Sequence, residues 1–232
     1  MGAKTAKVIE TKNLTEDVIE ITFETPEIFE FKAGQFVTIR IEDQIPPCFR
    51  AYSIKSAPNN SNTFKLCLKI VEGGRGSNWL NKLKIDDQIM FIGPSGKFLF
   101  KENGKDALFI ATGTGLTPFT SMAEDQLNKG YKGKLEILFG LRHIKSIFYQ
   151  DELDKLALEN QNFSHTITLS RPEDDSWQGS TGRVTSVLEK MDLDPNNTEI
   201  YICGLKEMID EVIKTLKNKG FSDESINEEK YD

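Results

Sequence analysis

The stretch Arg50-Ala51-Tyr52-Ser53 lies inside residues 47–58, Pro-Cys-Phe-Arg-Ala-Tyr-Ser-Ile-Lys-Ser-Ala-Pro, and has the form of an extended strand. It carries an arginine, an aromatic ring and a hydroxyl at positions i, i+2 and i+3. Arg50 offers a planar fork of donors that suits a phosphate, Tyr52 a ring that can stack on another ring, and Ser53 a donor for a ring nitrogen. A flavin nucleotide has all three of these partners. Hairpin strands also carry such residues by chance, so the stretch alone leaves both interpretations open.

Apolar and polar residues alternate on both sides of this stretch, up to about residue 100. The alternation is clearest in residues 19–24, 37–42 and 64–70. Strands of this kind have one face in a core and one face in water, and turn-rich clusters such as residues 58–62 separate them. We therefore expect an antiparallel β-barrel, interrupted by one short helix that begins near Ser77.

The run Gly73-Gly74-Arg75-Gly76-Ser77 stands directly before that helix. Glycines let backbone N–H groups approach an anion closely, and the start of a helix supplies unpaired donors. Ser77 is the expected N-cap, and Arg75 is expected to assist anion binding. A glycine-rich turn with an ordinary capped helix explains the same residues equally well.

The second part of the chain alternates short apolar strands with helices. Strands are expected at residues 107–111, 135–140, 166–170 and 199–203, and helices at residues 118–128, 151–158, 184–191 and 207–219. This alternation predicts a parallel sheet covered by helices on both faces. We therefore expect two domains: a flavin-binding β-barrel over residues 1–101 and a doubly wound α/β nucleotide-binding domain over residues 102–232.

Two segments at the carboxyl ends of these strands are candidate ligand contacts. Residues 110–118, Ile-Ala-Thr-Gly-Thr-Gly-Leu-Thr-Pro, lie between a strand and a helix, where a glycine loop can hold a pyrophosphate. Pro118 stands where the usual pattern has its third glycine, and it suits the first turn of a helix. Cys203 ends another strand and is small enough to pack against a nicotinamide ring, although many free cysteines are simply buried apolar residues.

The composition excludes several other classes of protein. A net charge of −7 and a pI of about 5.1 argue against nucleic acid as a partner. The three cysteines are scattered, which predicts reduced thiols, a cytoplasmic location, and neither a metal site nor an iron–sulfur cluster. No run of apolar residues is long enough to span a membrane, so we expect no membrane partner.

Together the four segments resemble the ferredoxin–NADP reductase family. Its R-x-Y-S, G-x-x-S, G-T-G-x-x-P and C-G motifs stand in order over essentially the whole chain. The resemblance implies a flavoenzyme that oxidises NADPH and reduces a separate carrier, ferredoxin or flavodoxin. We expect a monomer, although the sequence does not determine the oligomeric state. FAD is the usual flavin of such proteins, and FMN stays possible. The alternatives are a reductase component of an oxygenase, a reductase of free flavin, and a non-catalytic nucleotide-binding scaffold, which would need neither Ser53 nor the glycine loop.

The resemblance also assigns roles to individual residues. It implies catalytic roles for Ser53, Cys203 and Tyr231. The flavin contacts that it implies are Arg50, Ala51, Tyr52, Ser53, Leu68, Ile70, Gly74, Arg75, Gly76 and Ser77. The nicotinamide nucleotide contacts are Gly113, Thr114, Gly115 and Gly204. Tyr231 matches an aromatic that covers the flavin in this family, although here Asp232 follows it, and a frayed tail is the alternative interpretation.

Charges at the same sheet edge predict which nicotinamide nucleotide is preferred. A site selective for NAD usually has a carboxylate at the end of the second strand, and here that strand ends with Arg142. Ser170, Arg171 and Arg183 lie near the ends of the neighbouring elements and suit a 2′-phosphate. The acids at positions 173–175 follow closely and can weaken this positive field or pair with Arg171. On balance we expect NADPH to be preferred.

Overall fold

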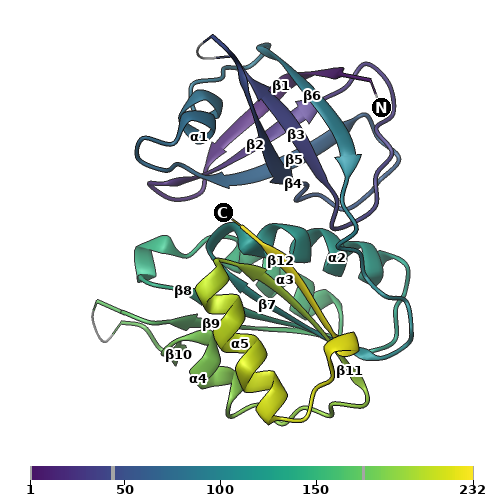
Figure 1. Ribbon diagram of the computed structural model, residues 1–232, viewed down its shortest axis with the longest axis vertical. Helices are drawn as coiled ribbons and strands as arrows, with labels where there is room; N and C mark the ends of the chain where they lie inside the picture. Colours follow the sequence, from purple (N-terminus) through teal and green to yellow (C-terminus); the bar gives the residue numbers. More distant parts are fainter. Residues whose placement is uncertain (1, 43–44, 174–175, 232) are drawn as a thin grey trace. The chain divides into compact units, whose positions relative to one another are not determined.

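The computed structural model describes residues 2–42, 45–173 and 176–231, which form two compact units (Figure 1). The first unit comprises residues 1–100 and 120–125, and the second comprises residues 101–119 and 126–232. The expectations about Asp174, Asp175 and Asp232 therefore lie outside the described residues. No helix in the described ranges is long and apolar enough to cross a membrane.

The first unit is an antiparallel sheet that curls toward closure. Its strands are β1 (Lys4–Asn13), β2 (Val18–Glu24), β3 (Phe36–Ile41), β4 (Cys48–Ser53), β5 (Thr63–Lys69) and β6 (Gln88–Ser95). Their order in space is β4-β3-β6-β1-β2-β5, and all of these pairings are antiparallel. A bridge between Ile54 and Leu66 joins the end of β4 to β5, so the two edges of the sheet meet. The predicted antiparallel barrel is confirmed.

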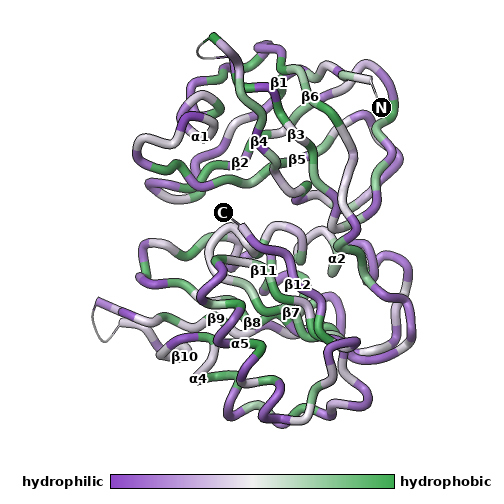
Figure 2. The backbone as a smooth tube through the Cα atoms, in the orientation of Figure 1, coloured by the Kyte–Doolittle hydropathy of each residue, from purple (hydrophilic) through white to green (hydrophobic). Residues whose placement is uncertain are grey.

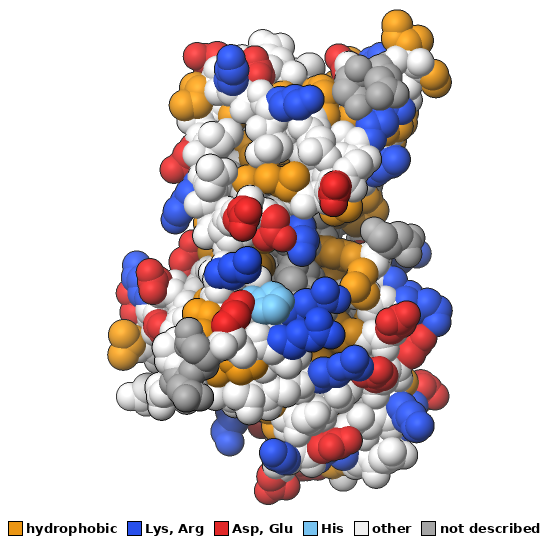
Figure 3. All heavy atoms as spheres, turned by 90° about the vertical axis from the view of Figure 1, so that its left-hand side faces the viewer, with side chains coloured by type: hydrophobic (Ala, Val, Ile, Leu, Met, Phe, Trp, Pro, Cys, Tyr) orange, Lys and Arg blue, Asp and Glu red, His pale blue; other side chains and the backbone are white. Residues whose placement is uncertain are grey.

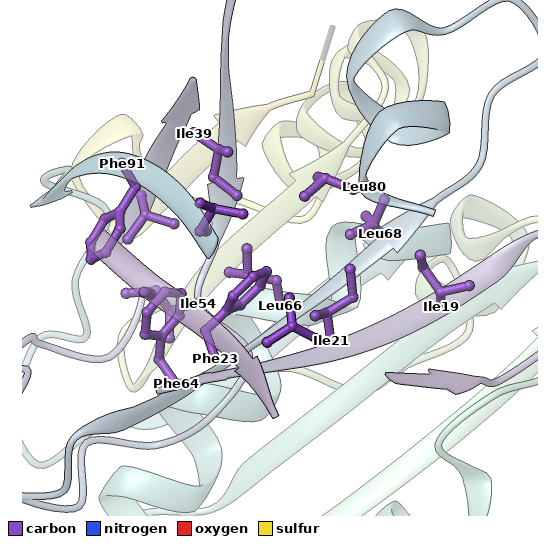
Figure 4. Packing of buried hydrophobic residues seen from close by; sticks show 14 of the residues in the cluster. Ile19, Ile21, Phe23, Ile39, Ile54, Phe64, Leu66, Leu68, Leu80 and Phe91 are labelled. Atoms are coloured by element: carbon purple, nitrogen blue, oxygen red, sulfur yellow. The ribbon is translucent and has the colours of Figure 1, made fainter. Parts of the chain in front are cut away.

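The barrel encloses an aromatic and aliphatic core. Figure 4 shows side chains from different strands, among them Phe23, Phe64 and Phe91, pointing toward one another. The expected water-facing side is wrong for β2, because Glu20 is only 4% exposed and Thr22 only 7%. These polar groups are buried with partners: Lys65 Nζ lies 3.0 Å from Glu20 Oε1, and Thr22 donates to a neighbouring carboxylate.

The interrupting helix α1 (Arg75–Leu80) begins two residues earlier than expected. Gly74 occupies its N-cap position without a side-chain cap, so the prediction of Ser77 as N-cap is wrong. The Ser77 hydroxyl is buried and accepts a hydrogen bond from the Val71 amide at 3.0 Å. It therefore closes the preceding turn rather than capping the helix.

The second unit is a parallel sheet with the predicted alternation of strands and helices. Its strands are β7 (Asp106–Thr112), β8 (Leu135–Leu141), β9 (Phe163–Leu169), β10 (Ser180–Thr181), β11 (Thr198–Gly204) and β12 (Ile226–Lys230). Its helices are α2 (Thr117–Asn128), α3 (Gln150–Glu159), α4 (Val184–Leu188) and α5 (Lys206–Asn218), with 3-10 turns at Gly113–Leu116, Ile144–Ser146 and Asp223–Ser225. The strand order is β10-β9-β8-β7-β11-β12, with every pairing parallel. The middle of α2 belongs to the first unit.

The two faces of this sheet bury different helices, as the alternation of side chains along a strand requires. Leu108 and Ile110 of β7 pack in the cluster that includes Val212 of α5, whereas Phe109 lies 5.1 Å from the Phe119 ring of α2. Hydrophobic residues run along β7 and β11 in Figure 2. The fold is therefore doubly wound, and its strand order reverses beside β7. Ligands of such sheets bind at the carboxyl ends of the strands near that reversal.

Candidate functional site

In the first unit, the candidate flavin residues of β4 lie against the start of α1. Arg50 and Tyr52 project to the same side of the strand, because they are two residues apart. A Cβ atom added to Gly76 would lie 2.6 Å from Tyr52 Oη and 2.9 Å from Arg50 Cγ. Only glycine lets the glycine run come this close to the arginine and the ring. Burial raises the pKa of the Tyr52 hydroxyl to about 12, so the ring stays neutral.

The other candidate flavin residues line the same part of the barrel. Ser53 ends β4 opposite Phe36 and is 7% exposed, whereas Ala51 is exposed. Leu68 and Ile70 lie at the end of β5 and just after it; the Leu68 side chain belongs to the barrel core, and the partly buried Ile70 packs against that core. Leu68 therefore has only its backbone groups to offer a ligand.

The glycine run makes a tight turn, in which hydrogen bonds to nearby carbonyls already engage the Gly74 amide and the Arg75 guanidinium. Gly73 has a φ of +69°, and the Gly74 amide donates to the Val71 carbonyl at 2.8 Å. The Arg75 guanidinium donates to the carbonyl of Pro46 at 2.9 Å. This contact directs part of the Arg75 guanidinium toward the loop before β4.

In the second unit, the glycine loop of η1 (Gly113–Leu116) packs directly on the end of β11. A Cβ atom added to Gly115 would lie 2.3 Å from the carbonyl oxygen of Cys203. Gly113 has a φ of +55°, and Thr117 Oγ1 donates to the Thr114 carbonyl at 2.7 Å. The two segments that sequence analysis singled out separately, the glycine loop and the C-G pair, thus form one surface.

Strand β12 and Tyr231 lie beside this surface, and the role of Tyr231 stays a prediction. Strand β12 pairs with β11 through Cys203↔Glu229, and the Tyr231 amide donates to the Gly204 carbonyl at 3.0 Å. Cys203 is fully buried. Burial raises the pKa of its thiol far above the usual range, Glu229 raises it further, and a hydrogen bond from Tyr231 opposes the shift. The thiol therefore stays protonated and does not act as a nucleophile.

Glu229 is a candidate functional residue that sequence analysis missed. Its Oε2 atom is buried without a hydrogen-bond partner among the described residues. Burial raises the pKa of this carboxyl to about 7. The position of Glu229 beside Cys203 follows from the pairing of β11 with β12, and nothing in the local sequence distinguishes it from Glu228. A carboxyl that titrates near neutral pH can hold or release a proton next to a ligand.

This carboxyl leads to a prediction about stability and pH. Because burial raises the pKa of this carboxyl from 4.5 to about 7, the unfolded chain ionises it first, and the folded protein loses stability as the pH rises from about 5 to about 7. Glu229→Gln should therefore raise the Tm at pH 8 by about 2–4 °C, the shift that about 1 kcal/mol produces in a chain of this size. The gain should disappear near pH 5. Thermal unfolding from pH 5 to 8 tests this, with Glu228→Gln as the control that should show no such trend.

Three arginines lie at the same carboxyl edge. Arg142 follows β8 and Arg171 follows β9, and the Arg171 amide donates to the Arg142 carbonyl at 2.8 Å. Ser170 joins them, because its amide donates to Leu141 at 3.0 Å. Arg183 also stands near the end of β9, but its guanidinium lies 3.1 Å from a Glu211 oxygen on α5. Arg142 and Arg171 are therefore the better placed pair for an anion.

No His, Cys, Asp and Glu side chains within the described ranges group in a way that could hold a metal ion. The glycine loop, the C-G pair and the arginine edge are instead suited to a dinucleotide, and the strand β4 with the glycine run is suited to a ring and a phosphate. The dinucleotide arrangement lies within the second unit, and the ring-and-phosphate arrangement lies within the first unit.

In comparisons with known proteins, two different family models match the first and the second part of the chain. Residues 5–100 match the family model described as an oxidoreductase FAD-binding domain, and residues 109–214 match the oxidoreductase NAD-binding domain. The chain is 36% identical over 239 residues to ferredoxin–NADP reductase B of Sorangium cellulosum, covering 98% of this chain and 97% of that protein.

Two further comparisons mark the range of similar proteins. One subunit of the Na⁺-translocating NADH-quinone reductase of Serratia proteamaculans is 31% identical over 90% of this chain, which spans only 56% of that larger protein. A ferredoxin–NADP⁺ reductase from Neisseria gonorrhoeae, solved with bound FAD and NADP, superimposes with a TM-score of 0.88. The match covers 99% of both chains at 24% identity, which supports the fold.

Proposed function

Because this chain belongs to the ferredoxin–NADP reductase family of oxidoreductases, we propose that it oxidises NADPH and passes the electrons through FAD to a separate ferredoxin or flavodoxin. The observation that carries the proposal is the similarity to a ferredoxin–NADP reductase along nearly the whole of both chains. The enzyme class follows from the family, and the carrier is our inference. The assay measures the rate at which the FAD-loaded protein oxidises NADPH, with and without added ferredoxin or flavodoxin. A rate that rises when the carrier is added would support the proposal.

The residues present fit FAD. The Tyr52 ring provides a stacking surface, and the Arg50 guanidinium provides a cation. Gly76, which has no side chain, leaves space for a phosphate beside them. Bound FAD would supply the acceptor for a hydride from the nicotinamide. Ser53 would donate a hydrogen bond to the ring nitrogen at which charge develops. Arg50 would hold the phosphates, with backbone groups of Gly74–Ser77.

The exposure of Arg50 limits how much its removal should weaken FAD binding. Its guanidinium is exposed and donates to its own neighbour, the Phe49 carbonyl, at 2.8 Å. Arg50→Ala should therefore weaken FAD binding by about 1.5 kcal/mol, or roughly tenfold, the lower end for a charge-assisted hydrogen bond. Titration of the flavin-free protein with FAD measures this loss. Unchanged affinity would remove Arg50 from the phosphate site.

On the nucleotide side, Thr114 and Gly115 would line the NADPH site, and Cys203 would pack against the nicotinamide. Cys203 is fully buried and hydrogen-bonded to Tyr231, so contact with a ring would require at least Tyr231 to move. Removing Tyr231 and Asp232 should therefore tighten NADP⁺ binding, because the full chain must first displace the tyrosine. Equal affinities of the full and shortened chains would argue against this gating role.

The second candidate function is a reductase component that serves an oxygenase or free flavin. The similarity to part of an NADH-quinone reductase, whose name includes no ferredoxin or flavodoxin, supports keeping the acceptor open. The two functions differ in their acceptor. Faster turnover with free FMN than with any ferredoxin or flavodoxin would favour the second. A monomer and a cytoplasmic location also stay proposals. Sedimentation tests the first, and three cysteines that are in no disulfide support the second.

A further inference from the structure

Helix α2 buries polar side chains in its middle. Figure 3 shows Lys, Arg, Asp and Glu side chains at the surface of one face of the molecule, where water solvates them. Thr120 and Ser121 of α2 differ from these, because they are only 2% and 0% exposed. Burying a hydroxyl group is unfavourable unless it forms a hydrogen bond, so the partners of these two side chains show what the helix holds in place.

Both hydroxyls donate to the segment that directly follows Ser53. Ser121 Oγ lies 2.7 Å from the carbonyl oxygen of Ser56, and Thr120 Oγ1 lies 3.3 Å from the carbonyl oxygen of Lys55. All of these residues belong to the first unit. The helix is therefore hydrogen-bonded to the backbone two and three residues beyond the serine that we assign to the flavin.

The same short segment is held from its other side as well. The Lys55 amide donates to the Lys65 carbonyl at 2.8 Å, and the Ser56 hydroxyl accepts a hydrogen bond from the Lys65 amide at 3.2 Å. The Lys55 side chain is only 6% exposed, and its Nζ lies 3.9 Å from Glu124 Oε1 of α2. Residues 55 and 56 are thus fixed between β5 and α2.

The segment before β3 also contacts this helix. The Gln35 carbonyl accepts a hydrogen bond from the Ile54 amide at 2.9 Å, directly after Ser53. Its neighbour Gly34 has a φ of +92°, and a Cβ atom added to Gly34 would lie 2.4 Å from Met122 Cε, so Met122 packs on the backbone there. Helix α2 therefore contacts the segment that follows Ser53 and the segment that is hydrogen-bonded next to it.

We propose that Thr120 and Ser121 are positioning residues for flavin reduction, because they fix the backbone from which Ser53 reaches the flavin. This role rests on the proposed function, in which Ser53 donates a hydrogen bond to the ring nitrogen. Such a donor acts fully only when it is held within about 0.5 Å of its productive position. Since β3 and β5 also hold this backbone, loss of the Ser121 hydroxyl should displace Ser53 only slightly, and we expect flavin reduction to slow about three- to tenfold.

The test is anaerobic stopped-flow reduction of the FAD-loaded full chain over a range of NADPH concentrations. Ser121→Ala should lower the limiting rate about three- to tenfold and change the Kd of NADPH less than about twofold, because the nucleotide contacts remain. Thr120→Val, which removes the longer hydrogen bond and keeps the side-chain shape, should lower the limiting rate about two- to threefold. Thr25→Val is the matched control, since it removes a buried hydroxyl that donates to the Glu27 carbonyl at 2.7 Å, and its limiting rate should equal that of the wild type.

Combining these changes with Ser53→Ala separates positioning from a general loss of structure. If Ser121 acts through Ser53, Ser121→Ala should cause no further loss of rate in the Ser53→Ala background. The same loss in both backgrounds would overturn the inference, and so would a wild-type limiting rate in Ser121→Ala. If Ser121→Ala does not fold, Thr120→Val decides the matter by the same comparison. A wild-type rate in Ser53→Ala would overturn the role of Ser53 and this inference with it, whereas a protein that binds no FAD would contradict the proposed function.

Discussion

Ser53→Ala is expected to slow the reduction of bound flavin by NADPH about 10²- to 10³-fold while the flavin stays bound. Ser53 is only 7% exposed, and it stands at the end of β4, where pairing with Phe36 holds the backbone. A fixed donor aimed at an atom that gains charge in the transition state contributes about 2.7–4 kcal/mol. The same donor contributes little to overall FAD binding, because Arg50, Tyr52 and the glycine run remain.

Anaerobic stopped-flow mixing with NADPH measures this rate directly. Ser53→Thr keeps a hydroxyl and should recover much of it, and Ser61→Ala, in the turn before β5, should react as the wild type does. A wild-type rate in Ser53→Ala would remove the catalytic role of Ser53. Loss of flavin from the variant would instead make Ser53 a binding residue.

Arg171→Ala is expected to lower kcat/KM for NADPH about 10- to 150-fold, equivalent to about 1.5–3 kcal/mol, and to change kcat/KM for NADH little. The backbone hydrogen bond to Arg142 holds Arg171 at the carboxyl edge of the sheet, where a 2′-phosphate is the group that distinguishes the two nucleotides. The loss should therefore be confined to the nucleotide that carries this phosphate.

Steady-state kinetics with both nucleotides test the assignment. Lys155→Ala, which removes an exposed positive charge from α3, controls for the general field of the protein. Equal losses with NADPH and NADH would mean that Arg171 supports the structure of the edge rather than the phosphate.

Patterns of neighbouring residues in the sequence predicted the strands and the glycine loops, because these elements depend on residues that are close together along the chain. Alternation of apolar residues identified β3 and β5, and the change to strands that alternate with helices identified the parallel sheet. Glycine positions marked the loops at Gly76 and Gly115, because each is a place where a Cβ atom would collide with another segment. Such requirements are visible in a sequence, since only one residue type satisfies them.

The features that sequence analysis missed depend on pairings between distant segments. Strand β12 is short and mostly polar, and its place at the sheet edge follows from pairing with β11. The raised pKa of Glu229 follows from the same pairing. Glu20 has the appearance of a solvent-facing residue, yet an ion pair with Lys65 accompanies its burial. The hydrogen bonds from α2 to the residues after β4 likewise join segments that lie far apart along the chain.

The central claim is that this chain is a flavoenzyme that takes electrons from NADPH in preference to NADH. The most direct measurement is the visible absorption spectrum of the purified protein after incubation with FAD and removal of the excess, followed anaerobically as each nucleotide is added. We expect a protein-bound flavin spectrum that bleaches rapidly with NADPH and more slowly with NADH. A protein that retains no flavin, or one whose flavin is bleached faster by NADH, would contradict the account.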